Sequence, residues 1–429
     1  MSRIYSIIEY LWGTPLTVFV VVVGLVLSFS IGFYQITHFK DVWKNTIGKK
    51  KDKSIINAAL AGTVGAGNIA GIATAIAAGG PGAIFWMWLI AFISMGTKFS
   101  EVLLSVKYQK KIDNEYLGGP MYYMKKLKGK LSKVLPIIYS VGLLILVVTD
   151  ACFVQTNTLA TSINETFNIP LWLIGIVLIA LSILIISRGF KKVTKIFNKM
   201  IPSMCIIYII ISLIVIIANI TNVPNSIYLI IKYAFQPAPV VGGFLGASVS
   251  AAIAKGAARG IFANEAGMGT SATVHAKTSE KPLAQACWGI VEVFIVSFII
   301  CTITALTVLS TNVWMSGETG AVMVLGAYSK VFGSLGKYIL CILLVLFTYS
   351  TYLGFYVEYK TTIIYLFKEK MYKYLKWFYF VPIIFACVLP IEAIWSIADI
   401  AVGIIIIPNL IALLLFSKKI KEILKGEIT

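Results

Sequence analysis

The sequence predicts an all-α membrane protein whose helices cross the bilayer many times. Three observations support this: 59% of the 429 residues are hydrophobic, only 13% are charged, and the mean hydropathy is +0.89. Apolar runs of about 18 residues or more, the length a helix needs to cross a membrane, recur along the whole chain. The two-residue alternation of an outer-membrane barrel is absent, so a helical bundle must satisfy the backbone polar groups in the bilayer.

Eleven spans are expected in chain order. They cover residues 14–37, 56–79, 83–106, 134–162, 170–187, 200–219, 240–262, 284–311, 335–366, 377–391 and 394–416. The first run begins at Thr14 and is long enough to span, which argues against a cleaved signal. Residues 417–429 are left as a polar tail.

Positive charge orients the predicted spans. Of the 37 Lys and Arg residues, 32 fall on one side of the membrane in this partition. They occupy the stretches 40–53, 107–133, 188–199, 255–281, 360–376 and 418–425. The opposite side holds Arg3, Lys232, Lys330 and Lys337, and Lys98 lies near the end of a span. Because Lys and Arg concentrate in cytoplasmic loops, the N-terminus is expected outside and the C-terminus in the cytoplasm. The net charge of +19 is therefore read as topogenic, and no nucleic-acid partner is expected.

Other classes of membrane protein find little support. The six cysteines lie in apolar stretches without a CxxC pair, which is typical of packing residues. Only His38 and His275 are present, no HExxH occurs, and neither histidine stands in a metal-ligand pattern, so an enzyme or a resident cofactor is not expected. A channel would need a repeated filter sequence, and a purely structural subunit is the third alternative.

Two spans contain glycines that would interrupt a helix. The second span carries Gly62, Thr63, Gly65, Gly67 and Asn68 in close succession, and the seventh reads VVGGFLGASVS from residue 240 to 250. Glycine weakens a helix, and Thr and Asn compete for its backbone hydrogen bonds. The alternative is that such glycines only allow close helix packing, as Gly67 and Gly71 at small-xxx-small spacing would.

The positions of these breaks predict an inverted repeat. Each lies near the start of a five-helix block, 56–219 and 240–416, with the span 14–37 as an extra helix. Paired interrupted spans are typical of secondary transporters. Unwound backbone offers amides to a carboxylate and carbonyls to a cation.

Residues 79–96 read GGPGAIFWMWLIAFISMG, which resembles the signature of the sodium:alanine (alanine or glycine:cation) symporter family. Further segments similar to that family are GTVGAGNIAG at 62–71, RGFKKVTKIFNKMIP at 188–202, RGIFANEAGMG at 259–269 and FTYSTYLG at 347–354. The likeness runs in order from about residue 56 to 400. It implies the leucine-transporter fold of the amino acid–polyamine–organocation superfamily, with five-plus-five inverted repeats.

The resemblance also implies a substrate site. The amides of Ala66 and Gly67 and the Thr63 hydroxyl should face the substrate carboxylate, and Gln155 should contact the substrate. On the other interrupted helix, the residues expected to line the pocket are Gly243, Phe244 and Gly246. A pocket of this kind would suit glycine or alanine, although size alone discriminates one methylene by only about 1–3 kcal/mol.

A Na⁺ site is implied beside it. The carbonyls of Ala61, Val64 and Phe347 and the hydroxyls of Ser350 and Thr351 would be its ligands. The alternative for the two hydroxyls is a bond to the preceding turn of their own helix.

Departures from the family pattern concern size and charge. Phe355 stands where the family usually shows Trp, which could enlarge the pocket, and Val296 stands where it usually shows Asp. Asp150 and Glu292 are intramembrane acids that the pattern does not contain, and such acids are functional candidates. With Asn68 they form a candidate polar or proton network. The alternative is that either acid lies near a water-filled vestibule or pairs with a lysine at the membrane edge.

The sequence thus predicts Na⁺-coupled uptake of alanine or glycine across the plasma membrane by alternating access. A proton-coupled symporter of the same fold, or one for serine or a larger neutral amino acid, is the alternative. Na⁺ is the coupling ion and the lipid bilayer the surrounding partner. The oligomeric state is left open.

Overall fold

A computed structural model describes residues 14–47, 54–112, 115–187 and 190–428. The predicted outer location of the N-terminus concerns residues 1–13, which lie outside the described residues. In the first half the helices are α2 (Thr14–Ser30), α3 (Tyr34–Thr37), α4 (Phe39–Asn45), α5 (Ser54–Thr63), α6 (Gly67–Gly79), α7 (Ala83–Lys107), α8 (Pro120–Met124), α9 (Leu131–Val147), the π-helix η1 (Val148–Val154), α10 (Gln155–Phe167), α11 (Leu171–Ser187) and α12 (Phe190–Ala218).

The second half is also helical. It contains η2 (Ile220–Asn222), α13 (Val223–Phe235), α14 (Val249–Asn264), α15 (Thr270–His275), α16 (Pro282–Val293), the π-helix η3 (Phe294–Cys301), α17 (Thr302–Ser310), η4 (Val313–Met315), α18 (Gly320–Phe332), α19 (Ser334–Leu375), α20 (Pro382–Val388), α21 (Ile391–Leu415) and α22 (Ser417–Ile428). A short antiparallel hairpin, β1 (Lys110–Ile112) with β2 (Glu115–Leu117), pairs Lys111 with Tyr116.

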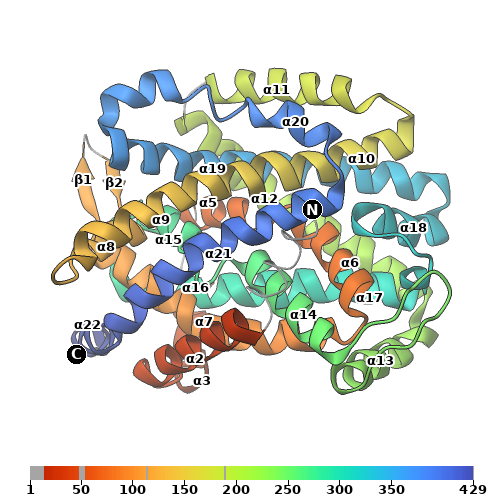
Figure 1. The fold of residues 1–429 in the computed structure, drawn as a ribbon, viewed down its shortest axis with the longest axis horizontal. Coiled ribbons are helices and arrows are strands. Elements are labelled where there is room, and N and C mark those ends of the chain that lie inside the picture. The colour runs from red at the N-terminus through yellow and green to blue at the C-terminus, as the bar shows by residue number, and fades with distance from the viewer. Residues whose placement is uncertain (1–13, 48–53, 113–114, 188–189, 429) are drawn as a thin grey trace.

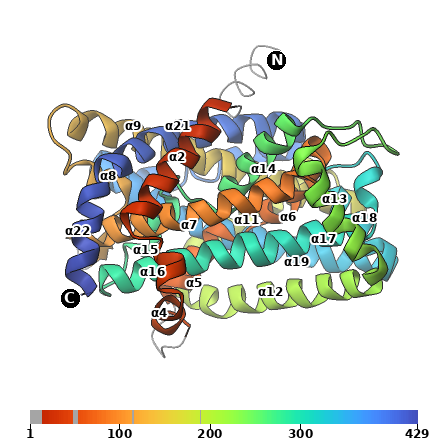
Figure 2. The same ribbon diagram turned by 90° about the horizontal axis from the view of Figure 1, so that it is seen from below.

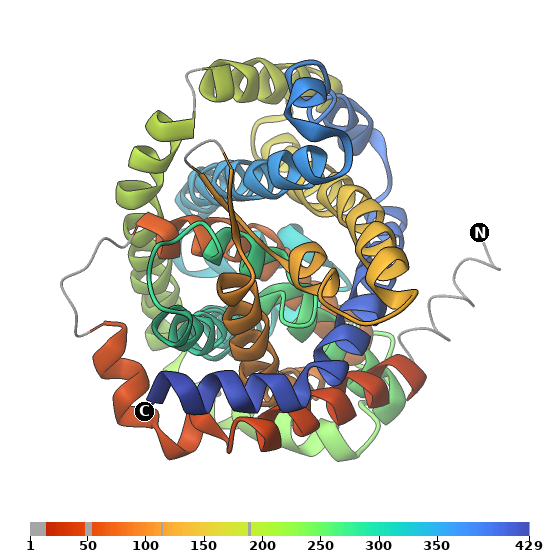
Figure 3. The ribbon, with the colours of Figure 1, turned by 90° about the vertical axis from the view of Figure 1, so that its left-hand side faces the viewer.

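The helices form one elongated bundle in which most axes follow the long dimension (Figures 1 and 2). Helix α7 packs against both α14 and α16, and α5 packs against α12, α15 and α19. Viewed from the end, α5 and α7 lie within a surround that includes α11, α12, α2 and α22 (Figure 3). The N-terminal helix α2 packs on α7 and α22, which fits its prediction as an element added outside the two repeats.

Among the described residues, seven helical stretches are long and apolar enough to cross a membrane. They are 55–79, 83–107, 131–167, 200–218, 282–310, 334–375 and 393–415. Three shorter apolar helices include the predicted first and fifth spans, Pro15–Ser30 and Leu171–Leu184. An all-helical membrane fold is therefore confirmed, whereas the count of eleven spans and the five-plus-five repeat stay predictions.

The first predicted break is confirmed. Helix α5 ends at Thr63 and α6 begins at Gly67, so the three intervening residues are unwound. Each half of this span is short, but together they are long enough to cross a membrane.

The second predicted break was misplaced. Residues 240–248 are an irregular segment before α14, with left-handed Gly242 and Gly246. The interruption lies instead at residues 265–269, between α14 and α15, where Glu265, Gly267 and Gly269 have positive φ angles of 56°, 87° and 74°. Left-handed backbone favours glycine and stops a helix.

Two long spans contain π-helical segments beside these breaks. Segment η1 joins α9 to α10 and carries Asp150, while η3 joins α16 to α17 and carries Ser297. Wide turns of this type re-aim side chains and are frequent at functional sites. Segment η1 contacts α19, which packs on α5, and η3 contacts α6 and α14 directly.

Lysine-rich segments gather at one end of the bundle. The hairpin β1–β2, α8 and the C-terminal helix α22 lie together at the left of Figure 1, while α13 and α18 lie at the right. Two basic residues counted with the cytoplasmic stretch 255–281, Lys255 and Arg259, lie within α14.

Candidate transport site

Side chains from α6, α10 and α19 surround the unwound segment of residues 64–66. Asn68 Nδ2 donates to the Thr63 carbonyl at 2.8 Å, bridging the break from its far side. Gly65 has no room for a side chain, since a Cβ there would clash with Thr351 Oγ1 and lie 2.9 Å from Gln155 Oε1. The glycine thus allows α19 and α10 to approach the backbone directly.

The predicted Na⁺ ligands converge at this point. Ser350 Oγ lies 3.3 Å from the Val64 carbonyl oxygen and 2.7 Å from that of Phe347, and Thr351 Oγ1 lies 3.1 Å from the Phe347 oxygen. All four residues are buried. The donor set contains only oxygen atoms, which suits a hard cation. Each hydroxyl also bonds to its own helix, as the back-bonding alternative expects, and the Na⁺ site stays a prediction.

Ala61 lies at the same seam between α5 and α19. A Cβ on Gly354 would be 2.5 Å from the Gly62 amide nitrogen and 3.1 Å from the Ala61 carbonyl carbon. The backbones of the two helices therefore touch at Ala61 and Gly62.

Gln155 covers the start of α6. The Gly67 amide donates to Gln155 Oε1 at 3.3 Å, and Gln155 Nε2 donates to Asp150 Oδ1 at 3.1 Å. Ala66, immediately before Gly67, is fully buried. A helix N-terminus favours a carboxylate, and here the carboxamide oxygen takes that place. Of the predicted substrate residues, Ala66, Gly67 and Gln155 are brought together.

An aromatic and ionic layer closes the other side of Gly67. A Cβ on Gly67 would be 3.0 Å from the Phe262 ring, which packs edge-on against Trp395 at 5.1 Å between centroids. The Arg259 guanidinium lies 4.0 Å above the Trp395 ring and pairs with Asp399 at 2.7 Å. This layer joins α14 to α21 directly beside the unwound segment.

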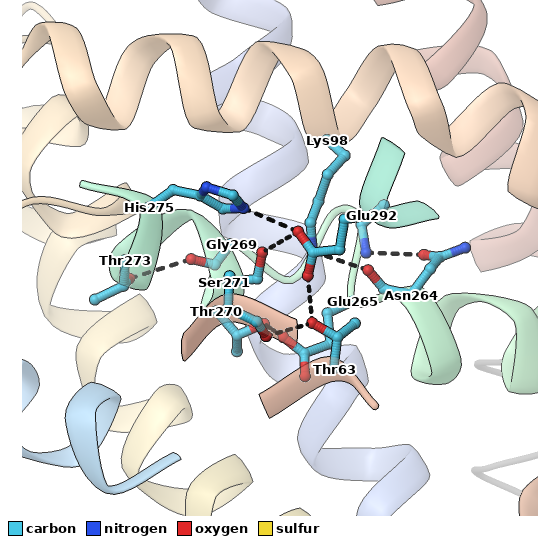
Figure 4. Close-up of polar contacts among 12 residues, drawn as sticks. Thr63, Lys98, Asn264, Glu265, Gly269, Thr270, Ser271, Thr273, His275 and Glu292 are labelled. Carbon is cyan, nitrogen blue, oxygen red and sulfur yellow. Dashed lines mark hydrogen bonds and ion pairs between the residues drawn. The ribbon is translucent and has the colours of Figure 1, made fainter. Parts of the chain in front are cut away.

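Glu292 is the centre of a second polar cluster (Figure 4). Its Oε1 accepts from the Thr63 hydroxyl, and its Oε2 accepts from Ser271 Oγ at 3.0 Å and contacts His275 Nε2 at 2.9 Å. Gln285 Nε2 lies 2.6 Å from His275 Nδ1. A neutral imidazole satisfies both contacts when Nδ1 accepts and Nε2 donates.

Lys98 completes this cluster from α7. It is fully buried, its Nζ lies 3.6 Å from Glu292 Oε1, and it donates to the Asn264 carbonyl at 2.8 Å. Asn264 is the last residue of α14, so the ammonium group sits at the negative end of a broken helix. Glu292 does pair with a lysine, but the expected place at the membrane edge is wrong, because Lys98 is fully buried inside the protein.

Asp150 and Glu292 belong to separate clusters. Asp150 bonds to Gln155, Glu292 bonds to Thr63, and no hydrogen bond or ion pair joins the two acids in the described part of the chain. Asn68, in the first turn of α6, donates to the Thr63 carbonyl, and no hydrogen bond among the described residues joins it to either acid. The predicted single network is therefore two networks on opposite ends of one break.

Three further expectations need correction. Gly243 and Phe244 lie beside η4, with Gly243 N donating to the Met315 carbonyl at 2.6 Å and Phe244 packing on Trp314, because their segment is a loop. Gly246 turns back toward Ala238 and Val240 in the same loop. The Thr63 hydroxyl points at Glu292, since that carboxylate needs donors. Phe355 is fully buried one turn beyond Thr351, and its effect on substrate size stays a prediction.

Sequence reasoning missed Lys98, Phe262 and the residues 265–269. The sequence signal for the second break was Gly267 and Gly269, at the end of the motif at residues 259–269. The neighbouring Arg259 and Glu265 made that stretch resemble a membrane edge, but both are buried. Ser271 and His275 both contact the Glu292 carboxylate. No hydrogen bond among the described residues joins Ser271 to the imidazole, so the pair lacks the nucleophile–base contact of an enzyme site.

Buried carbonyl and hydroxyl oxygens at a helix break, inside a bundle of membrane-length helices, are typical of polytopic transporters. The family model for the sodium:alanine symporter family matches residues 1–426. The chain therefore belongs to the sodium:alanine symporter family and is a transporter rather than an enzyme.

Individual relatives agree with this assignment. The chain is similar to an uncharacterised transporter of Haemophilus influenzae, with 37% identity over 98% of this chain and 94% of the relative. It is 32% identical to the sodium/alanine symporter AgcS of Methanococcus maripaludis, over 100% and 98% of the two chains. Among solved structures, a manganese transporter mutant of Eremococcus coleocola shares the fold, with a TM-score of 0.51 at 12% identity over 86% of this chain and 75% of that one.

Proposed function

We propose that the protein couples the entry of a small neutral amino acid, alanine or glycine, to that of Na⁺. The observation that carries this proposal is the convergence of the Val64 and Phe347 carbonyls with the Ser350 and Thr351 hydroxyls at the break between α5 and α6. Ala61 would complete the ligand set. A monovalent ion bound there would tie α5 to α19.

The amino acid would bind on the other side of the same break. Gly67 and Ala66 would offer amides to its carboxylate, and Gln155 would turn from the Gly67 amide toward the substrate. Phe262 and Phe355 are bulky and buried, which favours a small side chain. Because both ligands use residues 61–67, each would raise the affinity for the other by the same factor.

The proposed topology is eleven spans in two five-helix inverted repeats after α2, within the plasma membrane. The breaks at 64–66 and 265–269 would be equivalent elements of the repeats. The lysine-rich end, with the hairpin β1–β2 and α22, would face the cytoplasm. Transport would proceed by alternating access, with the layer of Arg259, Trp395 and Asp399 closing the side opposite the lysine-rich end.

A proton-coupled version is the second candidate, and the bond between Gln155 and Asp150 favours it. A proton on Asp150 would change the direction of that bond and hence the position of Gln155. The substrate range, including serine or a larger neutral amino acid, would follow from Phe355.

The experiment is uptake of radiolabelled alanine and glycine into liposomes containing the purified protein. An inward Na⁺ gradient should drive accumulation that unlabelled alanine competes, and a K⁺ gradient should not. Equal uptake in both salts, increased by an acidic exterior, would indicate that H⁺ rather than Na⁺ is the coupling ion. Absence of uptake by protein shown to be folded and inserted would contradict the substrate assignment.

A further inference from the structure

Lys98 occupies a position with the chemistry of a cation site. Its ammonium nitrogen bonds to the Asn264 carbonyl at 2.8 Å and faces the Glu292 carboxylate at 3.6 Å. Freed carbonyls at the C-terminal end of a broken membrane helix are typical Na⁺ ligands in transporters. Here the carbonyl at the end of α14 already has a cation, supplied by α7.

The surrounding groups would also suit an ion. Glu292 Oε1 accepts from the Thr63 hydroxyl of α5, and its Oε2 accepts from Ser271 of α15. The cluster thus joins the inner ends of both broken helices through one carboxylate (Figure 4). Lys98 brings a permanent ammonium group to Glu292 at 3.6 Å, and His275 contacts the other carboxylate oxygen at 2.9 Å.

The fold makes room for this lysine. A Cβ on Gly289 of α16 would lie 3.2 Å from Lys98 Cγ and 3.3 Å from its carbonyl oxygen. The glycine lets the aliphatic stem run along α16 to reach the end of α14. A buried ammonium requires a partner carboxylate and hydrogen-bond acceptors, and Asn264 and Glu292 provide them.

We propose that Lys98 is a tethered internal cation that replaces a second Na⁺, so that the transporter carries one Na⁺ per amino acid. This inference rests on the proposed function. The site near Val64 and Ser350 takes the mobile ion, whereas the site near Asn264 and Glu292 is filled permanently. Removing the ammonium group leaves a carboxylate, a free carbonyl and two hydroxyls that a Na⁺ ion can bind.

The test compares wild type with Lys98→Ala, using uptake and the melting temperature as functions of Na⁺ concentration. Wild type should show a Hill coefficient of about 1 for Na⁺, and Lys98→Ala should approach about 2. The Na⁺-dependent increase in stability, compared with K⁺, should become steeper in the variant because a second ion binds the folded state. Lys330→Ala is the matched control, since Lys330 also caps a carbonyl, that of Thr311 at 2.7 Å, without this carboxylate.

A double variant guards against misfolding. Removing one partner of a buried pair is far more damaging than removing both, so Lys98→Ala with Glu292→Gln should fold and return to first-order Na⁺ dependence. Lys98→Arg should keep the wild-type order. A wild-type coefficient of about 2, or a Lys98→Ala variant that keeps the wild-type order, would overturn the proposal.

The melting assay separates this inference from the proposed function. If wild type transports neither alanine nor glycine, the proposed substrate fails, yet an added Na⁺-dependent stabilisation in Lys98→Ala still supports the tethered cation. If that stabilisation does not appear in Lys98→Ala or is equal in Lys330→Ala, the tethered cation is wrong whatever the substrate.

Discussion

A single nitrogen of Arg259, Nη2, contacts both carboxylate oxygens of Asp399, at 2.8 and 2.7 Å. The pair connects α14 to α21 and is buried. Replacing Asp399 with Ala should leave a buried guanidinium without its counter-charge and destabilise the fold by about 3–5 kcal/mol. The melting temperature of the purified protein measures this. An unchanged value would mean that the pair is dispensable for stability, and Arg259→Leu with Asp399→Leu should recover most of the loss.

Removing hydroxyls at the proposed Na⁺ site should weaken ion binding. Ser350→Ala and Thr351→Ala each delete one oxygen ligand, worth about 0.5–1.5 kcal/mol, so the Na⁺ concentration for half-maximal uptake should rise about 2–10-fold. Thr361→Ala is the control, because Thr361 is buried on the same helix and bonds to Val357 O in its own helix. Equal effects of all three substitutions would count against a Na⁺ site.

Gln155 should control amino-acid affinity. Gln155→Leu removes the group that contacts the Gly67 amide, so the KM for alanine should rise about tenfold, the effect of losing about 1.4 kcal/mol of hydrogen bonding. Its Na⁺ dependence should remain. Asn164→Ala, on the same helix and bonded to Ile169 O, is the comparison. A Gln155→Leu protein with normal KM would remove Gln155 from the substrate site.

An ionic cluster at the lysine-rich end should make stability depend on pH. Burial lowers the pKa of Lys277 to about 8 despite Glu115 nearby, at 3.7 Å. Burial opposes the charge of Glu115 too, but Lys277 and Lys360 outweigh it and the pKa of this half-exposed carboxyl falls. The shift of Lys277 favours its neutral form, whereas that of Glu115 favours its charged form, because only the Lys277 side chain is buried.

The sign follows from Lys277. Folding disfavours the charged form of Lys277, so the unfolded chain binds more protons between pH 8 and 10.5 and the free energy of unfolding rises with pH in that window. Below pH 8 the buried charge lowers the free energy of unfolding by about 3 kcal/mol relative to its value above pH 10.5. The melting temperature of wild type should therefore rise between pH 8 and 10. Lys277→Met should flatten that rise, and a rise of the same size in both proteins would exclude Lys277 as its cause.

Two buried glutamates should respond in opposite ways to the same substitution. Among the described residues, neither carboxylate oxygen of Glu358 has a hydrogen-bond partner, and Oε1 lies 3.7 Å from the position of a Cβ on Gly62. Glu358→Gln should keep or raise the melting temperature, since an unpartnered buried carboxyl is costly. Glu292→Gln should lower it, because Lys98 would lose its counter-charge. Equal losses in the two variants would contradict this contrast.

Local sequence was sufficient to predict the helical class and the first break, since Gly65 and Gly67 stand within an otherwise apolar span. It was not sufficient for the second break. Two glycine-rich stretches could each have been the break. Only packing determines that residues 240–248 form a loop against Met315, whereas Gly267 and Gly269 are buried between α14 and α15. The cluster of Lys98 with Asn264 and Glu292 joins residues more than 150 positions apart. No pattern within either segment specifies that meeting.

The contact between Gly62 and Gly354 has a consequence for how the molecule would open. The two backbones are in direct contact there, so no water lies between α5 and α19 at this point. Since no side chains separate the helices, α5 cannot tilt away from α19 through gradual side-chain rearrangement. Separation would wet the seam abruptly and hydrate the Val64 carbonyl in the same step. Ion release and inward opening would then be one event, and a Gly354→Ala protein, wedged apart from the start, would leak Na⁺ without its amino acid.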